Sequence, residues 1–142
     1  MSANLIAKAS TTISAPASAV WDALTNPSLI KQYFFGTDAV SDWKEGSPLE
    51  FKGEWNGKQY IDKGVILKSE PAKLFQYTYL SSFSGLPDVP ENYANITYEL
   101  FEDNGETTLN VKQENVANED ARKHSEENWE LVLKNLKNLL EK

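Results

Sequence analysis

Two prolines, Pro16 and Pro27, constrain the fold of this chain more than any other feature, because each one favours the start of a helix. Proline suits the first turn of a helix, where its missing N–H has no partner to lose, and it disfavours helix for the residue before it. Ser14 is a candidate N-cap for the first helix. The sequence therefore predicts two short helices, over 16–25 and 27–33.

The first of these helices has one apolar face. Val20, Trp21 and Leu24 lie at spacings that bring them together on two turns of helix. A face of this kind packs against the rest of the fold. We therefore interpret Trp21 as a structural anchor rather than as a ligand contact.

Strand periodicity dominates the rest of the chain before its last segment. Residues 5–13 alternate between two faces, as a half-buried strand does. Turn signals separate further alternating runs, and Asn56-Gly57 is the strongest of them because this pair favours a two-residue hairpin loop. The expected strands lie near residues 5–13, 37–42, 49–55, 58–69, 74–80, 96–100 and 109–111.

The end of the chain changes to a helical period. Apolar residues recur at this spacing over 126–141, with Lys134 and Lys137 on the opposite face. Asn118 is a candidate N-cap, so we expect the helix to begin near it. The apolar positions are Trp129, Val132, Leu133, Leu136 and Leu140.

Composition limits the classes of function. The formal net charge is -7 and the pI is near 4.7, which disfavours nucleic acid and anionic membranes as partners. The chain has no cysteine, so disulfides and cysteine metal sites are excluded. It shows no signal peptide, and no apolar run of the ~18 residues that a membrane span needs. We expect a single cytoplasmic domain over residues 1–142.

Several segments, taken in order, form a family pattern. They are Thr12–Pro16, Val20–Pro27, Gly64–Leu67 followed by Pro71 and Leu74, Ile96–Leu100, and Trp129–Glu141. This pattern, together with the order of the elements, resembles the helix-grip fold of the START and birch-pollen-allergen (SRPBCC) superfamily. More specifically, the chain is similar to the homologues of the activator of the ninety-kilodalton heat-shock chaperone ATPase.

The resemblance implies an α+β fold. In that fold a curved antiparallel sheet of about six or seven strands wraps around the long C-terminal helix, and two short helices follow the first strand. An elongated cavity often lies between the sheet and the long helix. The family name also implies a link to a chaperone.

Aromatic residues are the first candidates for a binding site. Apolar side chains with a few tyrosine hydroxyls are typical of small-molecule cavities, although the same residues can simply fill a core. We expect Tyr77, Tyr79 and Trp129 nearest to any pocket, and Phe83 as a candidate lid in the loop 81–92. The predicted ligand-binding residues are Phe34, Phe51, Tyr60, Asp62, Phe75, Tyr77, Tyr79, Phe83, Tyr98, Trp129 and Leu133.

Two polar residues are considered for chemistry. Asp62 shares strand parity with Tyr60, so it can point inward, where a carboxylate could act as an acid or a base. The alternative for Asp62 is an edge position or an ion pair. His124, the only histidine, lies in a polar stretch and is interpreted as a solvated helix residue.

The sequence carries no motif for covalent or metal chemistry. It has no GxSxG motif, no Gly-rich phosphate loop and no pair of histidines at metal-ligand spacing. We therefore predict no catalytic residue, no metal site and no cofactor.

Three functions stay open at this point. The first is a non-catalytic binding module for a small hydrophobic or amphipathic molecule. The second is a chaperone-linked stress-response interaction protein. The third is an enzyme of the cyclase or hydrolase type that uses an inward carboxylate such as Asp62. We favour the first, in a protein that is a monomer or a weak homodimer.

Overall fold

The computed structural model describes residues 5–34, 36–55, 57–80, 87–116 and 118–141. The fold is α+β, as the sequence predicts. In chain order its elements are β1 (Leu5–Ile13), α1 (Ala17–Thr25), α2 (Pro27–Tyr33), β2 (Asp38–Ser41), β3 (Pro48–Trp55), β4 (Lys58–Glu70), β5 (Leu74–Tyr79), the short 3-10 helix η1 (Pro90–Asn92), β6 (Ala94–Asp103), β7 (Glu106–Val116) and α3 (Glu119–Leu140).

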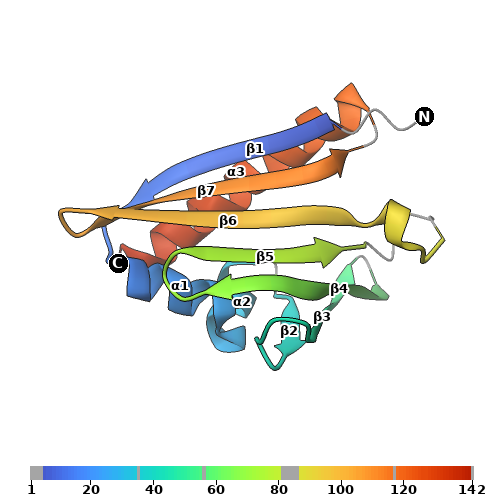
Figure 1. Cartoon of the computed structure of the whole chain (residues 1–142), viewed down its shortest axis with the longest axis horizontal. Coiled ribbons are helices and arrows are strands. Elements are labelled where there is room, and N and C mark those ends of the chain that lie inside the picture. The colour runs from blue at the N-terminus through green and yellow to red at the C-terminus, as the bar shows by residue number, and fades with distance from the viewer. Residues whose placement is uncertain (1–4, 35, 56, 81–86, 117, 142) are drawn as a thin grey trace.

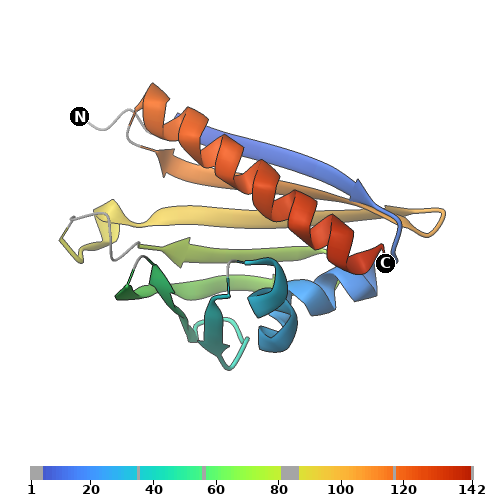
Figure 2. The same cartoon turned by 180° about the vertical axis from the view of Figure 1, so that it is seen from behind.

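One curved antiparallel sheet and one long helix form the two layers of the fold. The seven strands follow the order β1-β7-β6-β5-β4-β3-β2 (Figure 1). From behind, α3 runs diagonally across the sheet, and α1 and α2 lie close to its C-terminal end (Figure 2). Four α3 side chains, those of Trp129, Val132, Leu133 and Leu136, are buried against the sheet. None of the helices among the described residues has the length and hydropathy needed to cross a membrane.

The predicted strands are confirmed, with changes at their ends. In β1, Ala7 and Ile13 are fully buried and Lys8 is exposed, so the predicted faces hold. Trp55 pairs with Lys58, as a two-residue hairpin requires. The strand expected over 37–42 is shorter in the structure. Thr37 precedes β2, is buried, and its hydroxyl forms a hydrogen bond with the Tyr60 hydroxyl.

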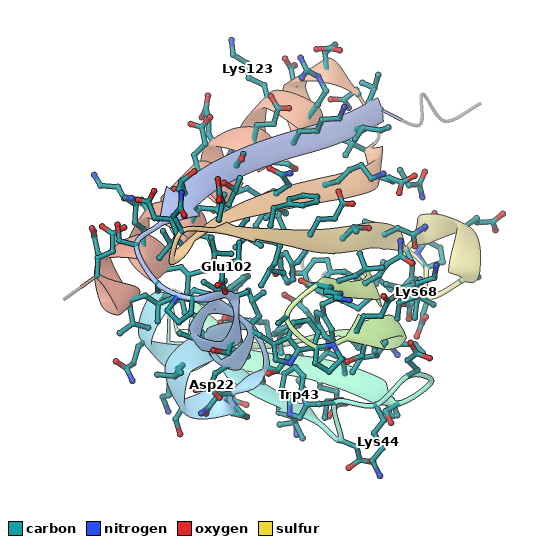
Figure 3. The ribbon with its side chains drawn as sticks, turned by 60° about the vertical axis from the view of Figure 1, so that its left-hand side comes forward. Asp22, Trp43, Lys44, Lys68, Glu102 and Lys123 are labelled. Atoms are coloured by element: carbon teal, nitrogen blue, oxygen red, sulfur yellow. The ribbon has the colours of Figure 1, made fainter. Side chains whose placement is uncertain are left out.

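The first helix is capped by a residue distant in sequence. Pro16 occupies the N-cap position, and its side chain makes no capping hydrogen bond. The Glu102 carboxylate of β6 lies beside α1 and accepts a hydrogen bond of 2.6 Å from the Ala17 N–H (Figure 3). A carboxylate suits this position because the first N–H groups of a helix lack partners. The prediction that Ser14 caps α1 is therefore wrong; the Ser14 N–H donates to Glu141.

The other two helices begin as predicted. Asn26 caps α2 by accepting a hydrogen bond of 3.0 Å from the Ser28 N–H. Asn118 caps α3 in the same way, accepting one of 2.8 Å from the Ala121 N–H. Both caps satisfy N–H groups that a helix start leaves open.

Side chains at the C-terminal end of the chain also cover the edge strand β1. The Lys8 N–H donates to Glu126, and the Lys137 ammonium donates to the Thr12 carbonyl at 2.5 Å. With the Glu141 contact to Ser14, these bonds lie on the edge of β1 that faces away from β7. Covering an edge in this way reduces its tendency to pair with another chain.

One glycine is required where β4 runs close beside its neighbour β5 in the sheet. A Cβ added at Gly64 would lie 1.6 Å from the carbonyl oxygen of Thr78. At the same point the Val65 N–H bonds the Thr78 hydroxyl rather than a strand carbonyl, and the register shifts between Ile66 and Lys68. The regular pairing of β4 is with β3 over 58–65 and with β5 over 66–70, so Gly64 lies next to the change of partner.

Gly64→Ala should therefore destabilise the fold by about 3 kcal/mol, because the added methyl group cannot avoid the Thr78 carbonyl without moving the strand. Urea denaturation at equilibrium measures this change. The neighbouring Val65→Ala, at an exposed position, is the control and should cost less than about 1 kcal/mol. Equal stability of the two variants would contradict this role of Gly64.

Candidate functional site

A cavity of about 570 Å³ lies between the sheet and α3. Its wall is built by the end of α2, the segment before β2, the inward faces of β3 to β7, and one side of α3. The described residues that line it are Phe34, Thr37, Phe51, Tyr60, Asp62, Tyr77, Tyr79, Ile96, Gln113, His124, Ser125, Asn128, Trp129 and Leu131.

One part of the wall is polar. Asp62 on β4 is only 7% exposed and accepts a hydrogen bond of 2.5 Å from the Tyr79 hydroxyl on β5. Two residues earlier on the same face, the Tyr60 hydroxyl shares a hydrogen bond of 2.7 Å with the Thr37 hydroxyl. Asp62 therefore points inward, which is one of the alternatives that its place in the sequence left open.

Aromatic rings form much of the remaining wall. Phe34 stacks on Phe51 with ring centroids 5.9 Å apart, and it meets Trp129 edge-on at 6.4 Å. The Trp129 indole N–H donates to the side-chain oxygen of Gln113 at 2.9 Å. This bond fixes the largest side chain of α3 and satisfies its polar group inside an apolar wall.

A buried tyrosine pair joins the cavity wall to the core, because Tyr77 lines the cavity and Tyr98 does not. The hydroxyls of Tyr77 and Tyr98 are 3.1 Å apart, and the Tyr33 hydroxyl donates to the Ala23 carbonyl at 2.9 Å. Burial raises the pKa of Tyr98 to about 12, and it raises the pKa of Tyr77 and of Tyr33 well above the usual value. The three rings are therefore neutral at physiological pH.

The structure divides the predicted ligand-binding residues into three groups. Seven lie on the cavity wall: Phe34, Phe51, Tyr60, Asp62, Tyr77, Tyr79 and Trp129. Phe75, Tyr98 and Leu133 are buried in the core and do not line the cavity. Phe83 lies outside the described residues.

Packing explains why Phe75 does not reach the cavity although it shares a strand face with Tyr77 and Tyr79. The ring of Trp21 on α1 meets Phe75 edge-on at 5.8 Å, and Trp43 lies 6.2 Å from it. These two indoles fill that end of the sheet. Trp21 is thus a packing residue, in line with its interpretation as an anchor.

Several residues of the cavity wall were not predicted from the sequence. Gln113 lies on the inward face of β7 with Leu109 and Val111, a parity that could have indicated it. On α3, His124, Asn128 and Leu131 follow helical spacing and lie along one stripe at the cavity. His124 is exposed, as predicted, but it stands at the rim, whereas Lys123 projects away from the sheet (Figure 3). Within the described residues no group of three or more acidic or histidine side chains is placed to hold a metal ion.

A second groove, of about 500 Å³, lies where β3, β4 and β5 meet the segment before β6. Lys63 and Val65 contribute to it from the face of β4 opposite to Asp62. An ion pair between Lys63 and Asp88 and a hydrogen bond of 2.6 Å from Tyr93 to Asp88 border this groove. The groove is therefore separate from the cavity under α3.

Comparison with known proteins identifies the family. The family model described as "Activator of Hsp90 ATPase homolog 1-like protein" matches residues 14–141. The chain belongs to this family. A comparison with curated proteins found no significant match.

Solved structures of several proteins share this fold. The solution structure of ChR145 from Cytophaga hutchinsonii has 47% sequence identity and a TM-score of 0.86, over 99% of this chain and 97% of that one. The Aha1 dimer from Colwellia psychrerythraea has 21% identity and a TM-score of 0.76, with 96% of each chain covered. DynU16, a protein of the dynemicin biosynthetic locus, has 17% identity and a TM-score of 0.79, over 96% of this chain and 47% of that one.

The buried tyrosines of this family member predict a loss of stability at high pH. An unfolded tyrosine ionises near pH 10, whereas folded Tyr98 stays neutral to about pH 12, because burial raises its pKa. The neutral Tyr98 hydroxyl therefore makes its full contribution to the free energy of unfolding below pH 10. This contribution is lost as the pH rises to about 12. The free energy of unfolding, measured in urea at pH 9 to 11, should fall less steeply in Tyr98→Phe, by up to about 1.4 kcal/mol per pH unit. An unchanged slope would contradict this role of the Tyr98 hydroxyl.

Proposed function

We propose that the protein is a non-catalytic binding module that holds one small amphipathic molecule in the cavity between the sheet and α3. The observation that carries this proposal is the cavity of about 570 Å³ with an aromatic wall and a small polar cluster. Small-molecule sites in proteins span roughly 300–1,000 Å³ and combine an apolar lining with a few polar groups. The module would act as one domain.

Burial of apolar ligand surface would supply most of the affinity, at roughly 25 cal/mol per Å² removed from water. Phe51, Tyr77 and Ile96 form the deep part of the wall, since all three are buried. The polar cluster around Asp62 and Tyr79 would then orient the ligand. Hydrogen bonds and ring contacts already hold these wall side chains, so ligand binding would require little ordering of the protein.

The exposed stripe of α3 is the expected entrance. Asn128 is exposed and Leu131 is 47% exposed, although both contribute to the cavity wall. A ligand passing this stripe would reach Trp129, which is buried directly behind it. The entrance therefore offers a place to block the cavity without disturbing the core.

Asn128→Trp should abolish binding, because a large side chain at an exposed wall position closes the entrance. The probe is 2-(1-naphthyl)ethanol, a neutral amphipathic molecule, and calorimetric titration measures its dissociation constant. At about 100 times that constant, the probe should raise the free energy of unfolding of the unaltered protein by about 2.7 kcal/mol.

Glu130→Trp is the matched control, since it places the same side chain on the same helix at an exposed position outside the cavity lining. This variant should bind the probe like the unaltered protein. The proposal is wrong if the unaltered protein shows no saturable binding, or if both tryptophan variants bind equally well.

Chaperone binding is the second candidate function. The family description names an activator of a chaperone ATPase, and apolar side chains stand exposed along the outer face of β4 at Ile61, Val65 and Leu67. A purified ninety-kilodalton chaperone should then be retained by the immobilised protein, and Val65→Glu should release it. The candidate is wrong if the immobilised protein does not retain the chaperone, or if Val65→Glu retains it equally well.

A further inference from the structure

We propose that the cavity selects amphipathic molecules whose polar end is an ammonium group, with Asp62 as the recognition residue. This inference rests on the proposed binding function and names the chemical class of its ligand. Three features carry it: a buried carboxylate on the wall, the distribution of positive charge, and the aromatic rings beside the carboxylate.

The carboxylate of Asp62 is already placed to receive a donor. It is 7% exposed, contributes to the cavity wall, and accepts a hydrogen bond of 2.5 Å from Tyr79. A carboxylate has about four lone-pair positions, so it can accept a hydrogen bond from a ligand in addition to those it accepts within the protein. Hydrogen bonds between an ammonium group and a carboxylate are about twice as strong as neutral ones.

The described lysine and arginine side chains lie outside the cavity lining. The one basic side chain of the described lining is His124, which stands exposed at the rim. Lys63, the next residue along β4, projects to the opposite face of the sheet and pairs there with Asp88. The whole chain also carries a net charge of -7, which raises the local concentration of cations and lowers that of anions.

Aromatic rings surround this end of the cavity. Phe51 lies directly opposite Asp62 in the pairing of β3 with β4, and the ring of Phe51 is 6.0 Å from the ring of Tyr79. Tyr60 lies two residues before Asp62 on the same strand face. Aromatic faces attract ammonium groups through their quadrupole, and the attraction grows when water is excluded.

An anionic ligand would be repelled by the Asp62 carboxylate. A carboxylic acid, such as a fatty acid, would bring a second negative charge into the same apolar enclosure as Asp62. Like charges at close range in a dry site are strongly unfavourable unless one is neutralised. The same wall therefore favours an amine over an acid of equal size and shape.

Three probes with one ring system separate these cases. They are 2-(1-naphthyl)ethylamine, 2-(1-naphthyl)ethanol and 1-naphthylacetic acid, each titrated calorimetrically at low ionic strength. We expect the amine to bind with a dissociation constant roughly tenfold below that of the alcohol, and the acid to bind more weakly than the alcohol.

Asp62→Asn should remove the advantage of the amine, so that the amine and the alcohol bind this variant with equal affinity. Glu54→Gln is the matched control, because it removes one negative charge from an exposed position on the neighbouring strand and should leave the preference intact. In the unaltered protein, the chemical shift of the Asp62 carboxyl carbon should change more on titration with the amine than with the alcohol. This measurement keeps the test decisive if Asp62→Asn does not fold.

The outcomes distinguish the two proposals. Three results overturn the ammonium inference and leave the binding function standing. They are binding of the alcohol without an advantage for the amine, an advantage that persists in Asp62→Asn, and equal shifts of the Asp62 carboxyl carbon with the two probes. Failure of all three probes to bind overturns both. A preference for the acid overturns the inference alone.

Discussion

The position of α3 over the sheet is the constraint on which the rest of the structure depends. Its buried side chains hold the helix against one part of the sheet, and the hydrogen bond between Trp129 and Gln113 ties it to β7. Glu126 and Lys137 bind the free edge of β1 at the same time. The helix therefore packs tightly along β1 and leaves an aromatic cavity toward β3, β4 and β5.

The polarity of this cavity follows from the strand pairing. Asp62 faces inward because it alternates with Ile61 and Lys63, which project to the other face of β4. β4 approaches β5 closely at Gly64, and two residues earlier Asp62 accepts a hydrogen bond from Tyr79 of β5. Among the described residues of the wall, Asp62 is the only acidic one, which supports the proposed choice of ligand.

Much of the fold could be predicted from the sequence, because strand and helix periods and turn residues are local signals. The caps at Asn26 and Asn118 are of this kind. The cap of α1 by Glu102 could not be predicted, since it depends on which strand lies beside the helix. The same limit applies to the site: strand parity indicated Asp62, but only tertiary packing separates Tyr77, on the wall, from the core residue Phe75.

The central claim is that the cavity under α3 holds the ligand, and intermolecular nuclear Overhauser effects test it most directly. Isotope-labelled protein would be mixed with 2-(1-naphthyl)ethylamine at saturating concentration. We predict contacts from the naphthyl protons to Phe34, Phe51 and Trp129, and from the methylene beside the nitrogen to Tyr79. Contacts confined to Val65 and Tyr93, which line the groove on the other side of the sheet, would contradict it.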